Sequence, residues 1–369
     1  MRGGAVKAIL VLDNGACFSG YSFGAPGERC SELVFNTSMT GYQEILTDPS
    51  YKGQSVVMTA PMIGSYGMMP EADEGDAPAV EGFVVREACE APSHWNSRES
   101  LRDYLVRHGV VAIGGIDTRA LVRQIRERGL LHACLATGDA DPAILLEKAR
   151  QYRGLDGIDT VQHVTTRVRY VYAARPHPDA PRVAVLDCGV KRRMLGMLAE
   201  SGCGVEVFPA GTRATEILAT HPDGVLLSNG PGDPAGLPLV LDTVRSLIGK
   251  VPVFGICLGH QLLALALGGR TYKLPFGHHG GNHPVQDLQT GRVEITSQNH
   301  NYAVDVSRVD EIEVTHVNLY DRTVEGMRHR TLPLFSIQYH PEAAPGPHDS
   351  TYLFAQFHRM MRPRVSVAG

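Results

Sequence analysis

The stretch that most constrains the fold of this chain is Val251–Gly269, whose sequence is VPVFGICLGHQLLALALGG. Its first residues are apolar and rich in β-branched side chains, which predicts a buried strand, and residues 258–267 predict a helix. Cys257 lies at the junction, with Gly255 and Gly259 two positions away on either side. This is the cysteine form of the Gly-x-nucleophile-x-Gly elbow, a strained strand-to-helix turn that needs small neighbours. A thiol at a helix N-terminus also experiences the positive end of the helix dipole, which favours the thiolate.

The alternative interpretation of Cys257 is a structural core cysteine, because free cysteine is among the most buried residue types. An elbow motif is a hypothesis until its surroundings supply a base and an oxyanion site. The rest of the chain therefore decides between the two interpretations.

Length and composition limit the kind of protein. With 369 residues the chain exceeds one ordinary hydrophobic core, which predicts two domains. Its net charge of −4 gives no reason to expect nucleic acid or an anionic membrane as a partner. The first apolar run is short and leads into a turn at Asp13-Asn14-Gly15, which predicts a strand rather than a signal peptide. The seven widely spaced cysteines predict reduced thiols and a cytoplasmic location.

Residues 1–150 predict an α+β domain, because short strand patterns come first and helical patterns follow. The clearest helix is Thr118–Arg128, with Asp117 as its N-cap and Gly129 after its last residue. Phe35–Tyr51 is polar and turn-rich but contains large side chains, which predicts an ordered surface loop with one helical turn. This half shows no nucleophile–base pair, phosphate loop or metal-ligand spacing, so its residues alone indicate a structural or docking domain.

Residues 151–181 predict a linker, since Arg175–Pro181 contains three prolines and cannot form a helix or a central strand. Residues 182–369 then alternate strand and helix patterns. That alternation predicts right-handed βαβ units, hence an α/β domain with a mostly parallel sheet. Active sites in such sheets lie at the carboxyl ends of the strands, which is where Cys257 falls.

Asn229-Gly-Pro-Gly-Asp233 also follows a predicted strand, so its backbone amides are expected to face the nucleophile. The amide of Leu258 is the usual first donor of an oxyanion hole, and that of Gly230 is the candidate for the second. The alternative is a plain turn rich in proline and glycine.

His340 and Glu342 stand two positions apart at the end of the stretch Leu334–Glu342, which predicts a strand. Strand residues two apart project to the same side, which suits a base held by a carboxylate. Alone, such a pair is usually a solvated surface pair. With Cys257 it completes a Cys-His-Glu triad for acyl transfer.

Gly277–Pro284 contains His278, His279 and His283, which suggests a metal site. The cluster includes no carboxylate or cysteine, and its glycines leave it poorly preorganised. We therefore expect a loop bordering the active site, with no metal. No phosphate-loop or dinucleotide-binding motif occurs in the sequence.

The constellation of Cys257, the Asn229–Pro234 turn and the His340/Glu342 pair resembles the class I (triad) glutamine amidotransferases, which have a flavodoxin-like fold. Nearly the whole chain resembles one family within that class, the small, glutamine-hydrolysing subunits of carbamoyl phosphate synthetase. The motifs that carry this resemblance are Phe35–Tyr51, Gly277–Val285, Ser297–His300 and His340–Asp349.

The resemblance implies that glutamine forms a γ-glutamyl thioester with Cys257 and that ammonia passes through a tunnel to a large subunit. There it meets bicarbonate and ATP to give carbamoyl phosphate for arginine and pyrimidine synthesis. ATP and a divalent metal would bind the large subunit, and this chain would hold no cofactor. The glutamine-binding residues implied by the motifs are Ser50, Gly230, Gly232, Leu258, Gln261, Asn299, Asn301 and Tyr302.

The sequence departs from the family pattern at two places. Asn301-Tyr302 stands where the family usually has Gly-Phe, and Tyr339 stands where glycine commonly precedes the catalytic histidine. Asparagine is the next-best residue if the backbone there is left-handed, so the contact is expected to survive. Tyr339 is expected to shift the orientation of His340 slightly.

Three other functions stay open on the sequence alone. The chain could serve another synthetase, such as one that aminates a nucleotide or an aromatic acid. It could be a catalytically silent regulatory subunit, although the intact triad argues against this. A cysteine peptidase is the weakest alternative, because no extended peptide-binding groove is evident.

Overall fold

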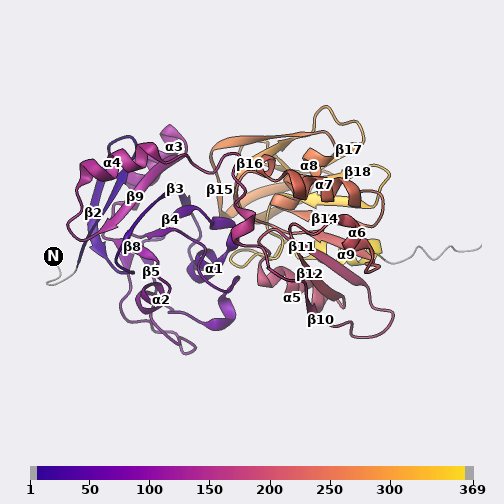
Figure 1. Ribbon diagram of the computed structural model, residues 1–369, viewed down its shortest axis with the longest axis horizontal. Helices are drawn as coiled ribbons and strands as arrows, with labels where there is room; N and C mark the ends of the chain where they lie inside the picture. The colour runs from indigo at the N-terminus through magenta and orange to yellow at the C-terminus, as the bar shows by residue number, and fades with distance from the viewer. Residues whose placement is uncertain (1–5, 362–369) are drawn as a thin grey trace, which may run out of the picture. The chain divides into compact units, whose positions relative to one another are not determined.

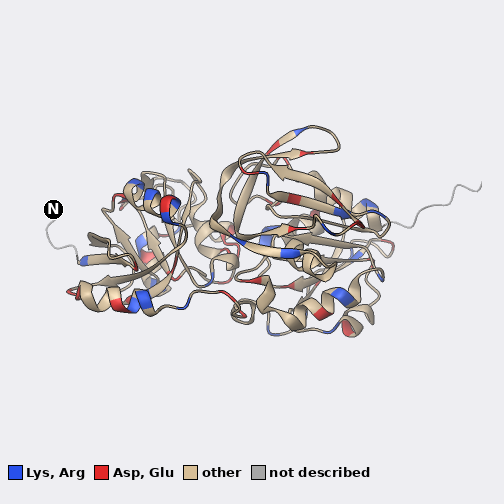
Figure 2. Cartoon of the chain, turned by 90° about the horizontal axis from the view of Figure 1, so that it is seen from above, with Lys and Arg blue, Asp and Glu red and all other residues tan. Residues whose placement is uncertain are grey.

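The computed structural model describes residues 6–361, and the chain divides into two compact units (Figure 1). The first unit comprises residues 1–156, 274–282 and 344–346, and the second comprises the remainder. Within residues 6–361, none of the helices combines the length and the apolar character needed to cross a bilayer. Lys and Arg are interspersed with Asp and Glu along both units (Figure 2).

The first unit is built on a closed barrel of seven strands. In barrel order these are β1 (Lys7–Leu12), β2 (Cys17–Ser22), β8 (Val111–Gly114), β6 (Gly82–Val84), β4 (Gln54–Met58), β3 (Glu28–Asn36) and β9 (Leu131–Thr137). A two-stranded sheet of β5 (Met62–Ile63) and β7 (Glu87–Ala88) accompanies it. The helices are α1 (Tyr42–Thr47), α2 (Leu101–Arg107), α3 (Thr118–Arg128) and α4 (Pro142–Gln151). Aliphatic and aromatic side chains from the strands fill the barrel, so it is a packed core.

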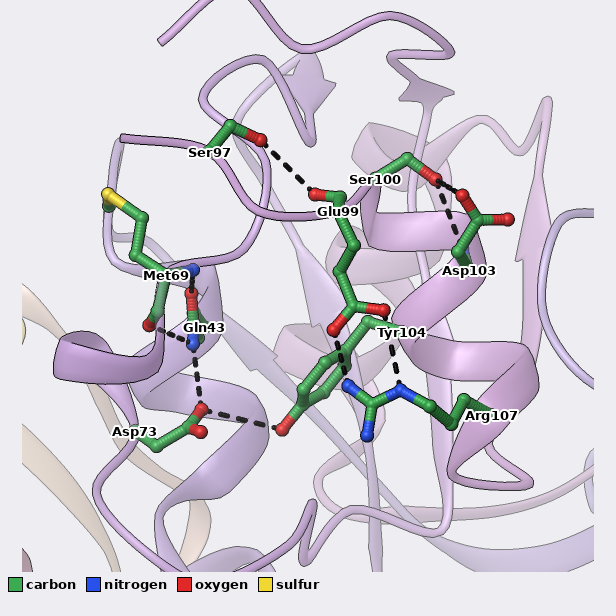
Figure 3. Close-up of polar contacts among 9 residues, drawn as sticks. All are labelled: Gln43, Met69, Asp73, Ser97, Glu99, Ser100, Asp103, Tyr104 and Arg107. Atoms are coloured by element: carbon green, nitrogen blue, oxygen red, sulfur yellow. Dashed lines mark hydrogen bonds and ion pairs between the residues drawn. The ribbon is translucent and has the colours of Figure 1, made fainter. Parts of the chain in front are cut away.

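Helix α1 and the 3-10 turn η1 (Pro49–Tyr51) lie within the predicted loop Phe35–Tyr51. The segment is largely buried rather than a surface loop, since Tyr42, Leu46 and Tyr51 belong to the core of this unit. Buried Gln43 fixes α1, because its amide nitrogen donates to the carbonyl of Met69 at 2.6 Å and to Asp73 at 2.7 Å (Figure 3). Its amide oxygen accepts from the backbone N–H of Met69 at 2.7 Å.

The same network reaches helix α2. The hydroxyl of Tyr104 donates to Asp73, and Ser100 caps the helix by accepting from the backbone N–H of Asp103 (Figure 3). Arg107 and Glu99 form an ion pair on the outside (Figure 3). The polar contacts therefore connect α1, which precedes Ser50, to Met69, to Asp73 and, through Asp73, to α2.

Cys30 and Cys134 form a disulfide between β3 and β9, where they lie directly opposite each other in antiparallel register. The expectation of reduced thiols is therefore wrong for this pair. The two residues are 104 positions apart, so no short cysteine spacing predicts their pairing. The other described cysteines, at positions 17, 89, 188, 203 and 257, are free.

The second unit contains a ten-stranded sheet. Its order is β10 (Tyr170–Ala173), β12 (Gly204–Pro209), β11 (Arg182–Asp187), β13 (Gly224–Leu227), β14 (Val253–Ile256), β19 (Leu334–Ile337), β18 (Val324–His329), β17 (Ile312–Asn318), β15 (Arg270–Asp287) and β16 (Val293–Asp305). The helices are α5 (Arg192–Glu200), α6 (Ala214–Leu218), α7 (Pro238–Leu247), α8 (Leu258–Ala266) and α9 (Tyr352–Met361).

Helices cover both faces of this sheet, because alternate strand residues are apolar on both sides. Leu226 and Phe254 pack with α5 and α9, whereas Val225 and Val253 pack with α7 and α8. Each face therefore has its own hydrophobic core.

The sheet is mixed rather than mostly parallel. The five strands from β12 to β19 are parallel, but β10 and the strands from β18 to β15 pair antiparallel. Parallel neighbours need long crossovers, whereas residues 287–292 and 318–324 are short connections of the hairpin kind. The expectation of a mostly parallel sheet is confirmed for the five strands from β12 to β19. It is wrong for β10 and for the strands from β18 to β15.

Candidate active site

Cys257 sits on a strained elbow between β14 and α8. Its backbone has φ 54° and ψ −104°, a conformation that residues with a side chain rarely adopt. The turn requires glycine on both sides: a Cβ on Gly259 would lie 2.2 Å from the carbonyl oxygen of Leu227, and one on Gly255 would lie 2.7 Å from that of Gly259. The thiol of Cys257 donates to the carbonyl of Asn299 at 3.6 Å.

His340 follows the neighbouring parallel strand, β19, and is buried with Glu342. Its Nδ1 lies 2.7 Å from Oε1 of Glu342, and its backbone N–H donates to the carbonyl of Ser297 on β16. Burial alone would lower the pKa of His340, but the negative charge of Glu342 and contact with the Cys257 thiol raise it to about 10. The imidazole is therefore suited to take and hold a proton from Cys257.

Lys191 contacts this pair, and the sequence did not predict it as a site residue. It is buried, and its Nζ lies 3.0 Å from Oε1 of Glu342 and 2.7 Å from the carbonyl oxygen of Ala343. Burial would raise the pKa of Glu342, but the charges of Lys191 and His340 lower it below its ordinary value. The signal was weak: Lys191 comes shortly after the end of β11, at the same edge of the parallel strands as Cys257.

Glu342→Gln should weaken the fold in a pH-dependent way. The raised pKa of His340 adds stability that is fully present below its ordinary value of 6.5 and is lost as pH rises to about 10. The lowered pKa of Glu342 adds stability that is present above 4.5 and is lost as pH falls. Wild type and variant should therefore differ most in their free energy of unfolding between pH 4.5 and pH 6.5. The expected difference is about 3 kcal/mol, as for removal of one partner of a buried pair. The difference in free energy of unfolding should become smaller toward pH 10 without disappearing, because the contact of Lys191 with Glu342 remains. Urea unfolding between pH 4.5 and pH 10 measures this difference, and a difference that widens between pH 6.5 and pH 10 would contradict the assignment.

The predicted oxyanion turn lies against the start of α8. A Cβ on Gly230 would lie 2.2 Å from the carbonyl oxygen of Cys188 and 2.8 Å from the side chain of Leu258, so only glycine fits. The backbone N–H of Gly259 donates to the carbonyl of Ser228, which ties the turn to the helix. Leu258 is the first helical residue, whose amide has no partner within the helix.

Gly232 in the same turn has φ +86°, and a Cβ there would lie 2.1 Å from the hydroxyl of Thr160. Thr160 belongs to the segment predicted as a linker. Nearby, the backbone N–H of Gly157 donates to Asp233 at 3.0 Å. Residues 157–160 thus pack on the turn and help to fix its shape.

The other predicted binding residues of this unit lie in α8 and β16. Gln261 lies one turn after Cys257 and donates from Nε2 to the carbonyl of Tyr302 at 2.9 Å. Asn299 and Asn301 lie within β16 with Tyr302, and the backbone at Asn301 is extended rather than left-handed. An asparagine in place of glycine is therefore tolerated without strain.

Two predicted features lie outside α8 and β16. Ser50 belongs to the first unit, in η1, where its backbone N–H donates to Asp48 at 2.9 Å. The histidine-rich segment Gly277–Pro284 lies inside strand β15, so the expectation of a loop there is wrong. Because neighbours on a strand point to opposite faces, His278 and His279 diverge.

Tyr339, the second departure from the family pattern, is fully buried. Its hydroxyl lies 3.5 Å from Glu294, which also accepts from Ser350 at 2.6 Å. The residue before His340 is thus anchored by its own polar contacts.

Sequence models of two families match the chain. The carbamoyl-phosphate synthase small chain, CPSase domain, matches residues 10–135, and the class I glutamine amidotransferase matches residues 184–360. A carbamoyl phosphate synthase small chain from Syntrophotalea carbinolica is 53% identical over 368 residues, covering 96% of this chain and 98% of that protein. This chain belongs to the carbamoyl-phosphate synthase small-chain family.

Other members of the family are similarly close. Small chains from Chlorobaculum tepidum and Aquifex aeolicus are 52% and 50% identical, each covering 96% of this chain and 98% of the relative. The match extends through both units, so membership in the small-chain family describes the whole chain and not only its amidotransferase part.

Proposed function

We propose that this chain is the glutamine-hydrolysing subunit of carbamoyl-phosphate synthase. The observation that carries the proposal is a buried array in which Cys257 lies on a nucleophile elbow and His340, Glu342 and Lys191 contact one another in series. The chain that contains this array matches the small-chain family over nearly its whole length. The array has every group that a thiol amidase needs: a nucleophile, a base and an orienting carboxylate.

In the proposed mechanism, His340 removes the proton of Cys257 and the thiolate attacks the γ-carbonyl carbon of glutamine. The amides of Leu258 and Gly230 stabilise the oxyanion. His340 then protonates the leaving nitrogen, so that ammonia departs and a γ-glutamyl thioester remains. Water, deprotonated by His340, hydrolyses the thioester to glutamate and restores the thiol. Glu342, held by Lys191, keeps the imidazole oriented and stabilises its positive charge.

Glutamine is proposed to bind through the residues that the family motifs imply. They are Ser50, Gly230, Gly232, Leu258, Gln261, Asn299, Asn301 and Tyr302. The close packing of Gly230 and the positive φ of Gly232 support a role for backbone amides. Ser50 would be supplied by the N-terminal domain, for which we propose residues 1–150, with 182–369 as the amidotransferase domain. Residues 151–181 would connect the two, and this connecting segment includes strand β10 of the ten-stranded sheet.

The ammonia is proposed to pass through a tunnel to a large subunit, which binds ATP and a divalent metal. There it reacts with bicarbonate to form carbamoyl phosphate for arginine and pyrimidine synthesis. This chain would hold no cofactor or metal of its own, would bind neither nucleic acid nor membrane, and would act in the cytoplasm. The large subunit and L-glutamine would be its partners.

The experiment is co-purification of the tagged chain from its native cell, followed by assay of the complex. With glutamine labelled with ¹⁵N in the amide, bicarbonate and ATP, the complex should form carbamoyl phosphate that carries the label. Recovery of a different synthetase, with an aminated nucleotide or aromatic acid as product, would contradict the proposal.

A further inference from the structure

The side chain of Gln261 is held from two sides. Gln261 follows Cys257 by one helical turn, so both residues face the same stretch of β16. The Cys257 thiol donates to the carbonyl of Asn299, and Nε2 of Gln261 donates to the carbonyl of Tyr302. That carbonyl also accepts from Nδ1 of His300 at 2.8 Å, which fixes its position.

The second contact of Gln261 is with Gln338, which lies between β19 and His340. Nε2 of Gln261 lies 3.1 Å from Oε1 of Gln338. Because a backbone carbonyl can only accept, the bond to Tyr302 requires that the nitrogen of Gln261, and not its oxygen, points inward. Both hydrogens of that nitrogen are then used. Oε1 of Gln261 makes no hydrogen bond to any described residue and is the group that remains for a ligand.

Gln338 has no other side-chain hydrogen bond within the described residues. It is fully buried, and its Nε2 is enclosed without a partner. A buried amide with an unsatisfied N–H group destabilises a fold relative to an apolar side chain of the same size. Retaining an amide here is therefore explained by the one bond it makes, to Gln261.

We propose that Gln338 is a positioning residue that fixes the amide of Gln261 so that it presents only an acceptor to the substrate. The inference rests on the proposed function, in which Gln261 binds glutamine. Because Oε1 of Gln261 can only accept a hydrogen bond, it favours a substrate group that donates one. Besides its amide, glutamine has one such group, the positively charged α-ammonium, which is a strong donor. Gln338 thereby makes the site select amides that carry an α-ammonium group.

The test compares two substrates with the complete complex: glutamine, and glutaramate, which keeps the γ-amide and the carboxylate but lacks the α-amino group. Gln338→Met removes one of the two acceptors at nearly constant volume, so that the carbonyl of Tyr302 alone orients the Gln261 amide. The ratio of kcat/KM for glutamine to that for glutaramate should fall about tenfold, through a higher KM for glutamine with kcat nearly unchanged. Gln338→Glu keeps an oxygen facing Gln261 and should hold the ratio within about threefold of wild type.

Further variants separate positioning from a structural effect. Gln261→Leu should lower the ratio equally, and adding Gln338→Met to it should change nothing more, since the two act through one contact. Ser31→Ala, which breaks the buried Ser31–Ser55 hydrogen bond of the barrel, is the control for general destabilisation and should leave the ratio unchanged.

The outcomes are distinct. An equal loss for both substrates, or a loss in Gln338→Glu as large as in Gln338→Met, would overturn the inference, because the acceptor oxygen would then not matter. A wild-type complex that fails to hydrolyse glutamine would instead overturn the proposed function. If Gln338→Met does not fold, Gln338→Glu, which should keep the ratio, and the single variant Gln261→Leu, which should lower it, carry the same test.

Discussion

Glutamine-dependent synthesis of carbamoyl phosphate should disappear when Cys257 is replaced by alanine, with a loss of at least about 10³-fold. The reason is that Cys257 is the residue between β14 and α8, and the neighbouring residues of this elbow carry no nucleophilic side chain. Cys257→Ser keeps an oxygen nucleophile of the same size but should lose nearly as much, because an alkoxide forms far less readily than a thiolate. Rates measured with glutamine and with an ammonium salt give the result.

The two nitrogen sources also provide the internal control. Ammonia-dependent synthesis by the same complex should persist within about twofold, since the thiol is not used when ammonia is supplied directly. Cys203→Ala is the matched variant: this cysteine is also free and buried, but it packs among apolar residues before β12. Glutamine hydrolysis retained by Cys257→Ala, or lost in Cys203→Ala, would contradict the assignment of the nucleophile.

The features that the sequence predicted well are those set by neighbouring residues. Helix α3 begins and ends where the sequence indicated, because Asp117 accepts from the backbone N–H of Ala120 and Gly129 adopts a positive φ at the end. The elbow at Cys257 is similar, since strand, nucleophile and helix are consecutive. His340 and Glu342 also pair across only two positions.

The features that could not be predicted from the sequence depend on residues far apart in the chain. Lys191 acts through Glu342 and through the carbonyl of Ala343, which is 152 positions away, and its own sequence context is that of an ordinary helix start. The Cys30–Cys134 disulfide depends on strand register in the barrel, which no local pattern specifies. The bond from Gln261 to Gln338 spans 77 positions and forms only because β14 and β19 are neighbours.

The largest effect that does not remove a reacting group is expected from Gly230→Ala. The new methyl group would lie 2.2 Å from the carbonyl oxygen of Cys188 and 2.8 Å from the side chain of Leu258. The Leu258 side chain can rotate away, but the Cys188 carbonyl is backbone and cannot yield without moving the turn, so the two oxyanion donors would no longer point at one site. Loss or displacement of one such donor lowers kcat by about 10²–10³-fold. Single-turnover release of glutamate from the complex measures this step.

Gly211→Ala is the matched control, because a Cβ at Gly211 meets nothing within 4 Å and its backbone is not left-handed. It should leave kcat and the unfolding midpoint within error of wild type. Ammonia-dependent synthesis should be normal in both variants, which separates a damaged oxyanion site from a complex that fails to assemble. A folded Gly230→Ala complex with undiminished kcat would place the second oxyanion donor elsewhere, because a turn forced away from Cys188 cannot keep its amide aimed at the thioester.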